Sequence, residues 1–265
     1  MGSDRVLPWI PILMYHRVVP EIVEPDPFGN CITVRAFASH LSWLRRLNFT
    51  CVSLDAIAAL ADEPTHAVAA PRRAFAITFD DGYQDNYDHA WPVLAEHGFT
   101  ATIFLVSGAI GGYNDFDRAN TPERVPMLSA SQVQQMHAAG ITFGSHTRSH
   151  PRDLVEQPRA AAEGEIRHSR EEIEDVVQAP IQHFSYPYTR VHPRLEGHVR
   201  EAGYRSACAG VGTSFTQFRL SRVFASQQHG PGLVTQMGIR RIKHLARPLL
   251  RPQAATLADR RMRTG

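Results

Sequence analysis

The stretch "WPVLAEHGFTATIFLV", residues 91–106, joins a helical pattern to an apolar strand through one glycine. Gly98 lies where the residue after a helix must adopt a positive φ, and the run after it is rich in the β-branched and aromatic residues that strands prefer. The same arrangement recurs at residues 131–146 around Gly140 and at residues 196–210 around Gly203. Repeated helix-then-strand units predict a parallel sheet with helices packed outside it.

Further segments extend this pattern. Residues 34–49 have helical spacing, and residues 158–177 predict a longer helix with Pro158 in its first turn. Three more runs predict strands, namely "WIPILMYH" (9–16), "IQHFSYP" (181–187) and "FRLSRVF" (218–224). The fold class is therefore α/β, and we expect an irregular (β/α) barrel of about seven or eight strands, with an open doubly wound sheet as the alternative. Both place the chemistry at the carboxyl ends of the strands.

Length and composition describe an ordinary globular chain. Its 265 residues predict one domain over residues 1–237, followed by a basic tail over residues 238–265. The formal net charge of +2 does not indicate a nucleic-acid partner. The three cysteines form no Cys-x-x-Cys pair, so neither a cysteine zinc site nor a disulfide framework is expected.

The two ends of the chain bear on where it acts. The amino-terminal sequence has no apolar run long enough for a signal or a membrane-spanning helix, which predicts a cytoplasmic protein. In the tail, leucines and isoleucines at helical spacing alternate with arginine and lysine, as in a helix that lies on a membrane surface. Peripheral membrane contact through the tail and a disordered basic tail both fit this pattern.

Two clusters of polar residues follow predicted strands. In "AFAITFDDGYQDNY", residues 74–87, an apolar run is followed by Asp80, Asp81 and Gly82. Adjacent carboxylates resist joint ionisation unless a cation or a shared proton relieves them. In "ITFGSHTRSHPRDL", residues 141–154, His146 and His150 are spaced so that a helix or turn would bring both imidazoles to one ion.

These residues also carry a resemblance to a known family. "TFDDG" (78–82), "SHTRSH" (145–150) and "FSYPY" (184–188) resemble the three signature motifs of the NodB-homology polysaccharide deacetylases, carbohydrate esterase family 4. "ILMYHRV" (12–18) is similar to the opening strand of the branch that acts on exopolysaccharide and poly-N-acetylglucosamine. The resemblance covers roughly residues 8–224, with the motifs in the expected order.

The resemblance implies a role for each residue of the motifs. Asp81, His146 and His150 would bind a divalent metal, most often zinc in this family, and Asp80 would be the general base toward a metal-activated water. The backbone N–H of Tyr188 would stabilise the oxyanion. We also expect substrate contacts from Tyr83, Pro187 and Tyr188. The implied reaction is hydrolysis of an N-acetyl group on a polysaccharide, a lipid-linked sugar or another glycan precursor.

The sequence departs from the family pattern at three positions. Family members often carry an arginine in the third motif that orients the catalytic aspartate, whereas Ser185 stands here, and Thr189 replaces a common glycine. The late Leu-x-His that supplies the general acid aligns with residues 220–222, which contain no histidine. We expect His16 to donate the proton instead, with His192 and His229 as weaker candidates. His16 could alternatively do no more than hydrogen-bond a neighbouring loop.

Other functions stay open at this point. The missing arginine and histidine fit a glycan-binding relative without turnover, and an O-acetyl esterase could use the same scaffold. A carboxylate with two histidines is also the ligand set of non-haem iron oxygenases, although those are usually all-β proteins. The long segment 108–128 follows a predicted strand and is expected to contact the substrate or to be mobile.

Overall fold

A closed barrel of parallel strands forms the centre of the molecule. The computed structural model describes residues 7–23, 26, 28–62, 71, 73–118, 123–212, 214–227 and 230–250, the last nine of these by their backbone alone. The seven strands of the ring are β1 (Ile12–Tyr15), β5 (Ala74–Phe79), β6 (Thr102–Leu105), β7 (Thr142–Ser145), β8 (His183–Ser185), β9 (Ser206–Val211) and β11 (Arg219–Phe224). β1 pairs with β5 on one side and with β11 on the other, which closes the ring and confirms the predicted barrel.

Four short strands lie outside the ring. β4 (Thr50–Cys51) pairs with the first residues of β5, and β10 (Phe215–Thr216) pairs antiparallel with β11. β2 (Arg17–Val19) and β3 (Cys31–Thr33) form a separate parallel pair directly after β1. This small sheet therefore lies beside the carboxyl end of the barrel, where the chemistry is expected.

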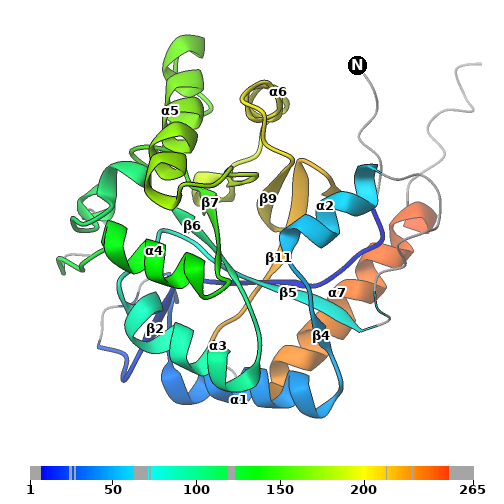
Figure 1. The fold of residues 1–265 in the computed structure, drawn as a ribbon. Coiled ribbons are helices and arrows are strands. Elements are labelled where there is room, and N and C mark those ends of the chain that lie inside the picture. Colours follow the sequence, from blue (N-terminus) through cyan, green and yellow to red (C-terminus); the bar gives the residue numbers. More distant parts are fainter. Residues whose placement is uncertain are drawn as a thin grey trace, which may run out of the picture.

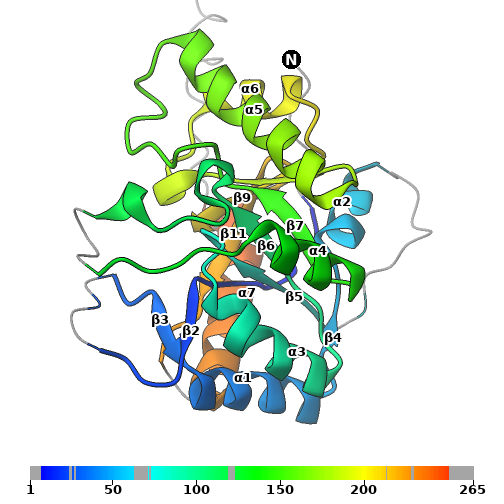
Figure 2. The same cartoon turned by 60° about the vertical axis from the view of Figure 1, so that its left-hand side comes forward.

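Helices cover the outside of the barrel (Figures 1 and 2). They are α1 (Val34–Arg46), α2 (Leu54–Asp62), α3 (Trp91–His97), α4 (Ala130–Ala138), α5 (Arg159–Val177), α6 (Pro193–Glu201) and α7 (Gly230–Leu250). α1 packs against α3 and α7, whereas α5 packs against α4 and α6. Among the described helices, none has both the length and the apolar composition that crossing a membrane requires.

Helix ends follow the predicted signals. Gly98 caps α3 with a φ of 66°, and its N–H returns to the carbonyl groups of the last turn. Gly140 and Gly203 also have positive φ, at 91° and 85°, and each leads into the next strand. Pro158 is the N-cap of α5, one residue outside the helix in which it was predicted. The predicted boundary between residues 237 and 238 falls inside α7.

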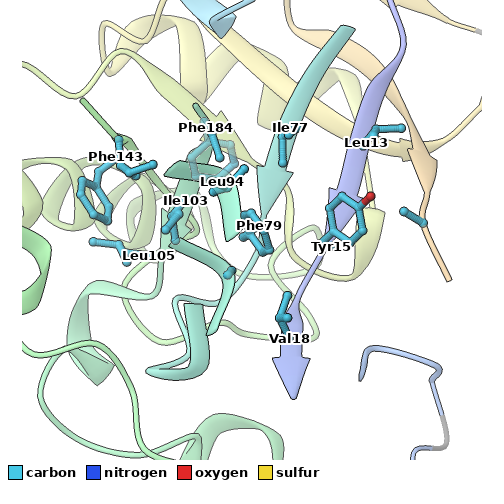
Figure 3. Packing of buried hydrophobic residues seen from close by; sticks show 14 of the residues in the cluster. Leu13, Tyr15, Val18, Ile77, Phe79, Leu94, Ile103, Leu105, Phe143 and Phe184 are labelled. Atoms are coloured by element: carbon cyan, nitrogen blue, oxygen red, sulfur yellow. The ribbon is translucent and has the colours of Figure 1, made fainter. Parts of the chain in front are cut away.

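Side chains alternate along the strands and form two separate cores. Leu13, Tyr15, Ile77, Phe79 and Ile103 pack with the helices in one large apolar cluster (Figure 3). The intervening residues, which include Ile12, Ala76, Phe104, Cys208 and Leu220, form a second cluster. Because successive strand residues point to opposite faces, this second cluster fills the interior of the barrel. Gly144 leaves space for it, since a Cβ there would lie 2.5 Å from the ring of Phe104.

Candidate metal centre at the carboxyl end of the barrel

Polar side chains gather where the parallel strands end. Asp80 and Asp81 follow β5, His146 follows β7, and His16 follows β1. Because the strands run parallel around a closed ring, their carboxyl ends lie on one rim. These residues line a cavity of about 340 Å³. The tertiary structure therefore brings together residues that are up to 134 positions apart in the sequence (His16 to His150).

The three predicted metal ligands converge on one point. Nε2 of His146 lies 3.6 Å from Oδ1 of Asp81, and Nε2 of His150 lies 3.5 Å from the same oxygen. The two Nε2 atoms are 3.2 Å apart. Ligand atoms about 2.0–2.2 Å from a tetrahedral zinc ion are separated by roughly 3.3–3.6 Å, so these distances fit one divalent cation. All three residues are buried.

Neighbouring groups orient the imidazole of His146 and hold the turn that carries His150. Nδ1 of His146 lies 2.8 Å from the carbonyl oxygen of Ser185, to which it donates, so the lone pair of Nε2 faces the cluster. His150 is held in a turn whose amides, the N–H groups of Arg148 and Ser149, donate to Glu165 on α5 at 3.0 and 2.8 Å. Support from surrounding groups of this kind is typical of a built metal site.

The electrostatics of these three residues favour a bound cation. Burial and the neighbouring Asp80 raise the pKa of Asp81 well above its usual range. Burial lowers the pKa of His146 and His150, so both imidazoles are neutral at pH 7. The set consists of two neutral imidazoles and one carboxyl group that resists ionisation. A divalent cation would favour the ionised carboxylate and accept both nitrogen lone pairs, so these residues fit such an ion.

Two of the predicted ligands also have strained backbones. Asp81 has a φ of 74° and His150 a φ of 55°, in the left-handed region that residues with a Cβ rarely adopt. Gly82 follows with a φ of 82°, and a Cβ there would lie 2.6 Å from a methyl group of Leu105. Strain of this kind persists where the surrounding structure imposes it, most often at functional sites.

Asp80 has a different partner from Asp81. Nη1 and Nη2 of Arg222 on β11 donate to Oδ1 and Oδ2 of Asp80, each at 2.7 Å. Both side chains are buried. Burial alone would raise the pKa of Asp80, but the guanidinium outweighs it and holds this pKa well below its usual range. Asp80 is therefore a fixed carboxylate next to the metal cluster and not one of its ligands.

His16 lies in the same cavity. Its ring is half-buried, its Nδ1 is inaccessible and has no hydrogen-bond partner among the described residues, and Phe224 packs edge-on to it at 6.3 Å. Burial lowers its pKa to about 4. His192, by contrast, caps α6 by accepting the N–H of Arg194, and it does not line the cavity. His229 lies outside the described residues.

The predicted substrate-binding residues separate into two groups. Tyr188 lines the cavity, where its ring centre lies 4.6 Å from that of His150 and 4.7 Å from the guanidinium of Arg152. Tyr83 is buried and hydrogen-bonds Asp81, so it supports a metal ligand and does not line the cavity. Pro187 is likewise buried and does not line it.

The long segment after β6 reaches the cavity, and its predicted contact with substrate stays a prediction. Its short helical turn, η3 (Asp115–Asp117), packs Phe116 against His150 with ring centres 4.9 Å apart. Asp117 lines the cavity, and its Oδ1 lies 3.6 Å from Nη2 of Arg152. Asp117 could not be predicted from the sequence, because nothing in residues 108–128 shows which side chain turns inward.

Comparison with known proteins identifies the family. A family model described as Polysaccharide deacetylase matches residues 67–207, which is more than half of the chain and includes both metal motifs. The chain belongs to the polysaccharide deacetylase family. This result confirms the resemblance drawn from the sequence motifs.

Individual relatives agree with this assignment. A Bacillus subtilis (strain 168) protein, YxkH, named provisionally as a polysaccharide deacetylase, is 28% identical over 74% of this chain and 62% of its own length. The poly-β-1,6-N-acetyl-D-glucosamine N-deacetylase of Staphylococcus epidermidis is 26% identical over 66% of this chain and 63% of its own length. This chain thus spans somewhat less than two thirds of both relatives.

A solved structure shares the fold. The structure of IcaB from Ammonifex degensii superposes with a TM-score of 0.71 at 21% identity, and the match covers 90% of this chain and 97% of that one. At this level of identity the likeness concerns the fold alone, and it agrees with the closed (β/α) barrel.

In this member of the polysaccharide deacetylase family, the arginine beside Asp80 comes from an unexpected strand. The sequence analysis treated it as missing, because Ser185 stands at its place in the third motif. Arg222 supplies a guanidinium to Asp80 from β11, and its Nη2 also donates to Oγ of Ser185 at 3.0 Å. An arginine inside the apolar strand "FRLSRVF" was the available signal, since a buried arginine requires a partner of opposite charge.

Proposed function

We propose that this protein is a metal-dependent hydrolase that removes acetyl groups from N-acetylated sugars of a polysaccharide or glycan precursor. The observation that carries the proposal is a group of three residues, Asp81, His146 and His150, that could bind one cation. Asp80 lies beside them but pairs with Arg222 and is not part of the group. Family membership and the named activity of the Staphylococcus epidermidis relative support the same chemistry. The reaction would consume water and release acetate and a free amine.

Asp81, His146 and His150 would hold the metal. One carboxylate with two imidazoles suits zinc, among other divalent ions, and leaves coordination positions open, as catalytic sites require. When bound, such an ion supplies Lewis acidity toward the acetyl carbonyl and makes water more acidic. The protein holds the two imidazoles neutral in advance, so no proton has to leave them when the ion binds.

Asp80 would accept the proton of the attacking water. Arg222 uses one lone pair on each carboxylate oxygen, and the remaining lone pairs are free to accept a proton. The same ion pair keeps Asp80 ionised at every physiological pH and fixes its orientation. Because its low pKa makes it a weak base, Asp80 depends on the water being acidified, and a proton that it accepts is readily passed on.

His16 would deliver a proton to the leaving amine. With a pKa of about 4 it is neutral at pH 7, so it must first receive the proton that leaves the water. Asp80 lies close enough to raise the pKa of His16 electrostatically, which makes it the natural proton source. The resemblance assigns the backbone N–H of Tyr188 to the oxyanion.

Two alternatives differ in what they predict. The absence of an arginine in the third motif favoured a glycan-binding relative without turnover. Arg222 weakens that argument because it pairs with Asp80 from another strand. An O-acetyl esterase would use the same residues on a better leaving group. Ester and amide substrates therefore have to be compared directly.

Acetate release from poly-N-acetylglucosamine oligosaccharides tests the proposal. We expect turnover by the metal-loaded protein and a loss of roughly 10²–10⁴-fold in Asp80→Asn, which keeps the shape but removes the base. Asp88→Asn serves as the control because Asp88 is exposed and lies outside the cavity. Equal turnover in Asp80→Asn and wild type, at equal metal content, would refute the assignment. Turnover on O-acetyl sugars alone would establish the esterase.

A further inference from the structure

A second cavity lies at the opposite end of the barrel from the metal centre. Its volume is about 450 Å³, against about 340 Å³ for the catalytic cavity. Its wall is formed by Trp9 and Ile10, which precede β1, by Phe49, which precedes β4, and by Val234 and Met237 of α7. Residues that precede parallel strands lie at their amino ends, so this cavity opens away from the catalytic rim.

Two arginines border this cavity. A polar cavity of about 580 Å³ shares Pro71, Arg73 and Arg241 with the apolar one and adds Asn48 and Thr50. Nη1 of Arg73 donates to the carbonyl group of Leu47, which holds this guanidinium at the border between the two cavities. Arg241, on α7, is exposed.

No acidic group neutralises these arginines in the part of the chain that the structure describes. No aspartate or glutamate lines either cavity there, and neither guanidinium has a described carboxylate within ion-pair distance. Most other arginines on the described surface do pair with acids, as Arg159 does with Glu163. Two unneutralised cations beside an apolar cavity are complementary to an anion that carries an apolar chain.

We propose that these joined cavities bind one anionic membrane lipid, with an acyl chain in the apolar cavity and the phosphate between Arg73 and Arg241. A small hydrophilic phosphate would leave the wall formed by Trp9, Phe49 and Met237 in contact with water. An acyl chain removes that apolar surface from water, and a phosphate satisfies planar guanidinium donors.

The sequence of α7 supports a membrane source for the lipid. From Gly230 to Leu250 the helix has no aspartate or glutamate, and Arg240, Arg241, Lys243 and Arg247 follow one another within two turns. Basic residues next to a lipid site are attracted by the negative surface of a bilayer. This site is distinct from a tail that lies on the surface, because its apolar part is built from residues that precede β1 and β4 as well as from α7.

Binding at this end would also orient the enzyme. The lipid site is at the amino ends of the strands and the metal centre is at their carboxyl ends, so a bound barrel would direct its catalytic cavity away from the bilayer. The protein would then act on sugar chains that extend from the membrane and not on groups at its surface.

Vesicle binding with brominated lipids tests the proposal. Bromine on acyl chains quenches tryptophan fluorescence at short range, and Trp9 lines the apolar cavity. We expect wild-type protein to bind phosphatidylcholine vesicles that contain phosphatidylglycerol, with quenching when the phosphatidylglycerol chains are brominated. Trp9→Phe should bind equally well and lose most of the quenching. The double variant Arg73→Gln/Arg241→Gln should lose vesicle affinity by about tenfold or more.

The control variant removes the same charge elsewhere. Arg45→Gln/Arg46→Gln changes two exposed arginines in the last turn of α1 and should bind vesicles nearly as well as wild type. An equal loss in both double variants, or vesicle binding without quenching at Trp9, would reduce the effect to general surface attraction and overturn the proposal. So would saturation by glycerol phosphate at the same concentration as lipid, or no vesicle binding at all.

Measuring catalysis tests the lipid site separately from the proposed function. Arg73→Gln/Arg241→Gln should release acetate from soluble oligosaccharides at the wild-type rate, because both arginines lie at the end of the barrel away from the metal centre. Loss of lipid binding with full turnover supports the lipid site whatever the catalytic assignment. Loss of turnover together with lipid binding would indicate a disturbed fold, which the free energy of unfolding measures directly.

Discussion

The two ends of the barrel differ in which residues adopt the left-handed backbone conformation. At the amino end the chain enters this conformation mostly on glycine, at Gly98, Gly140 and Gly203 between helix and strand. At the carboxyl end Gly82 adopts it too, but so do five residues with side chains, which are Asp81, Thr147, His150, Tyr188 and Thr189. Glycine carries little strain there, whereas each other residue costs of order 1–3 kcal/mol. The end that carries the proposed chemistry thus stores more strain than the amino end, where Asn48 and Gln178 are the described residues with side chains in this conformation.

The ends also differ in how they carry charge. Within the described residues, the carboxyl end buries Asp80, Asp81, His146, His150 and Arg222 in one connected group, and the amino end exposes Arg73 and Arg241 beside an apolar cavity. Buried charges need fixed partners, and exposed ones are stabilised by water until a ligand arrives. The carboxyl end is therefore the region in which substitutions should have the largest effects on stability.

Breaking the buried ion pair should have the largest effect. Arg222→Met leaves Asp80 buried without its partner, and we expect the free energy of unfolding to fall by about 3–5 kcal/mol in urea denaturation. Arg219→Met is the matched control on the same strand, since Arg219 pairs with Glu196 nearer the surface and should cost about 1 kcal/mol or less. Similar losses in both variants would mean that the buried pair contributes no more to the free energy of unfolding than the pair nearer the surface.

Metal should stabilise the carboxyl end next most strongly. Zinc at a free concentration one hundred times its dissociation constant should raise the free energy of unfolding by about 2.7 kcal/mol, and a chelator should reverse this rise. Asp81→Asn should abolish the response, while Asp55→Asn, at a carboxylate outside the cavity, should keep it. A full response in Asp81→Asn would place the ion elsewhere.

Acid should weaken the carboxyl end through His16. Its pKa is about 4 in the folded protein and about 6.5 when unfolded, so between these values the unfolded state binds the additional proton. Stability contributed by the neutral ring is present above pH 6.5 and is lost as the pH falls toward 4, at about 1 kcal/mol per pH unit. We expect His16→Gln to flatten the pH dependence of the free energy of unfolding of the chelated protein by this amount. An unchanged slope would show that His16 is not held neutral.

Relieving strain should have the smallest effect, with opposite signs at the two ends. Thr189→Gly, where φ is 58°, should raise the free energy of unfolding by up to about 1 kcal/mol, because glycine adopts this conformation without strain. Gly98→Ala, where φ is 66° and a Cβ would meet nothing within 4 Å, should lower it by about 1 kcal/mol. Thermal unfolding measures both. Destabilisation by both variants would remove the contrast between the two ends.

Much of this protein could be predicted from local sequence. Helix-glycine-strand units determined the α/β class, because capping and strand preference depend on neighbouring residues. The positions of Asp80, Asp81, His146 and His150 after predicted strands were enough to place them on one rim. The predicted roles of Tyr83 and Pro187 in substrate binding stay untested, and both side chains lie outside the cavity.

The rest depended on contacts between distant residues. Closure of the ring rests on β1 pairing with β5 and β11, and the partner of Asp80 lies 142 positions away at Arg222. No local pattern encodes such a pairing, because the partner of Asp80 can come from any strand that reaches it. Here the partner is Arg222 of β11, while the third motif carries Ser185. The sequence by itself determined which chemical groups stand at the strand ends. Only the tertiary structure decided which of them meet, since a buried charge is satisfied by whatever partner the closed barrel brings within reach.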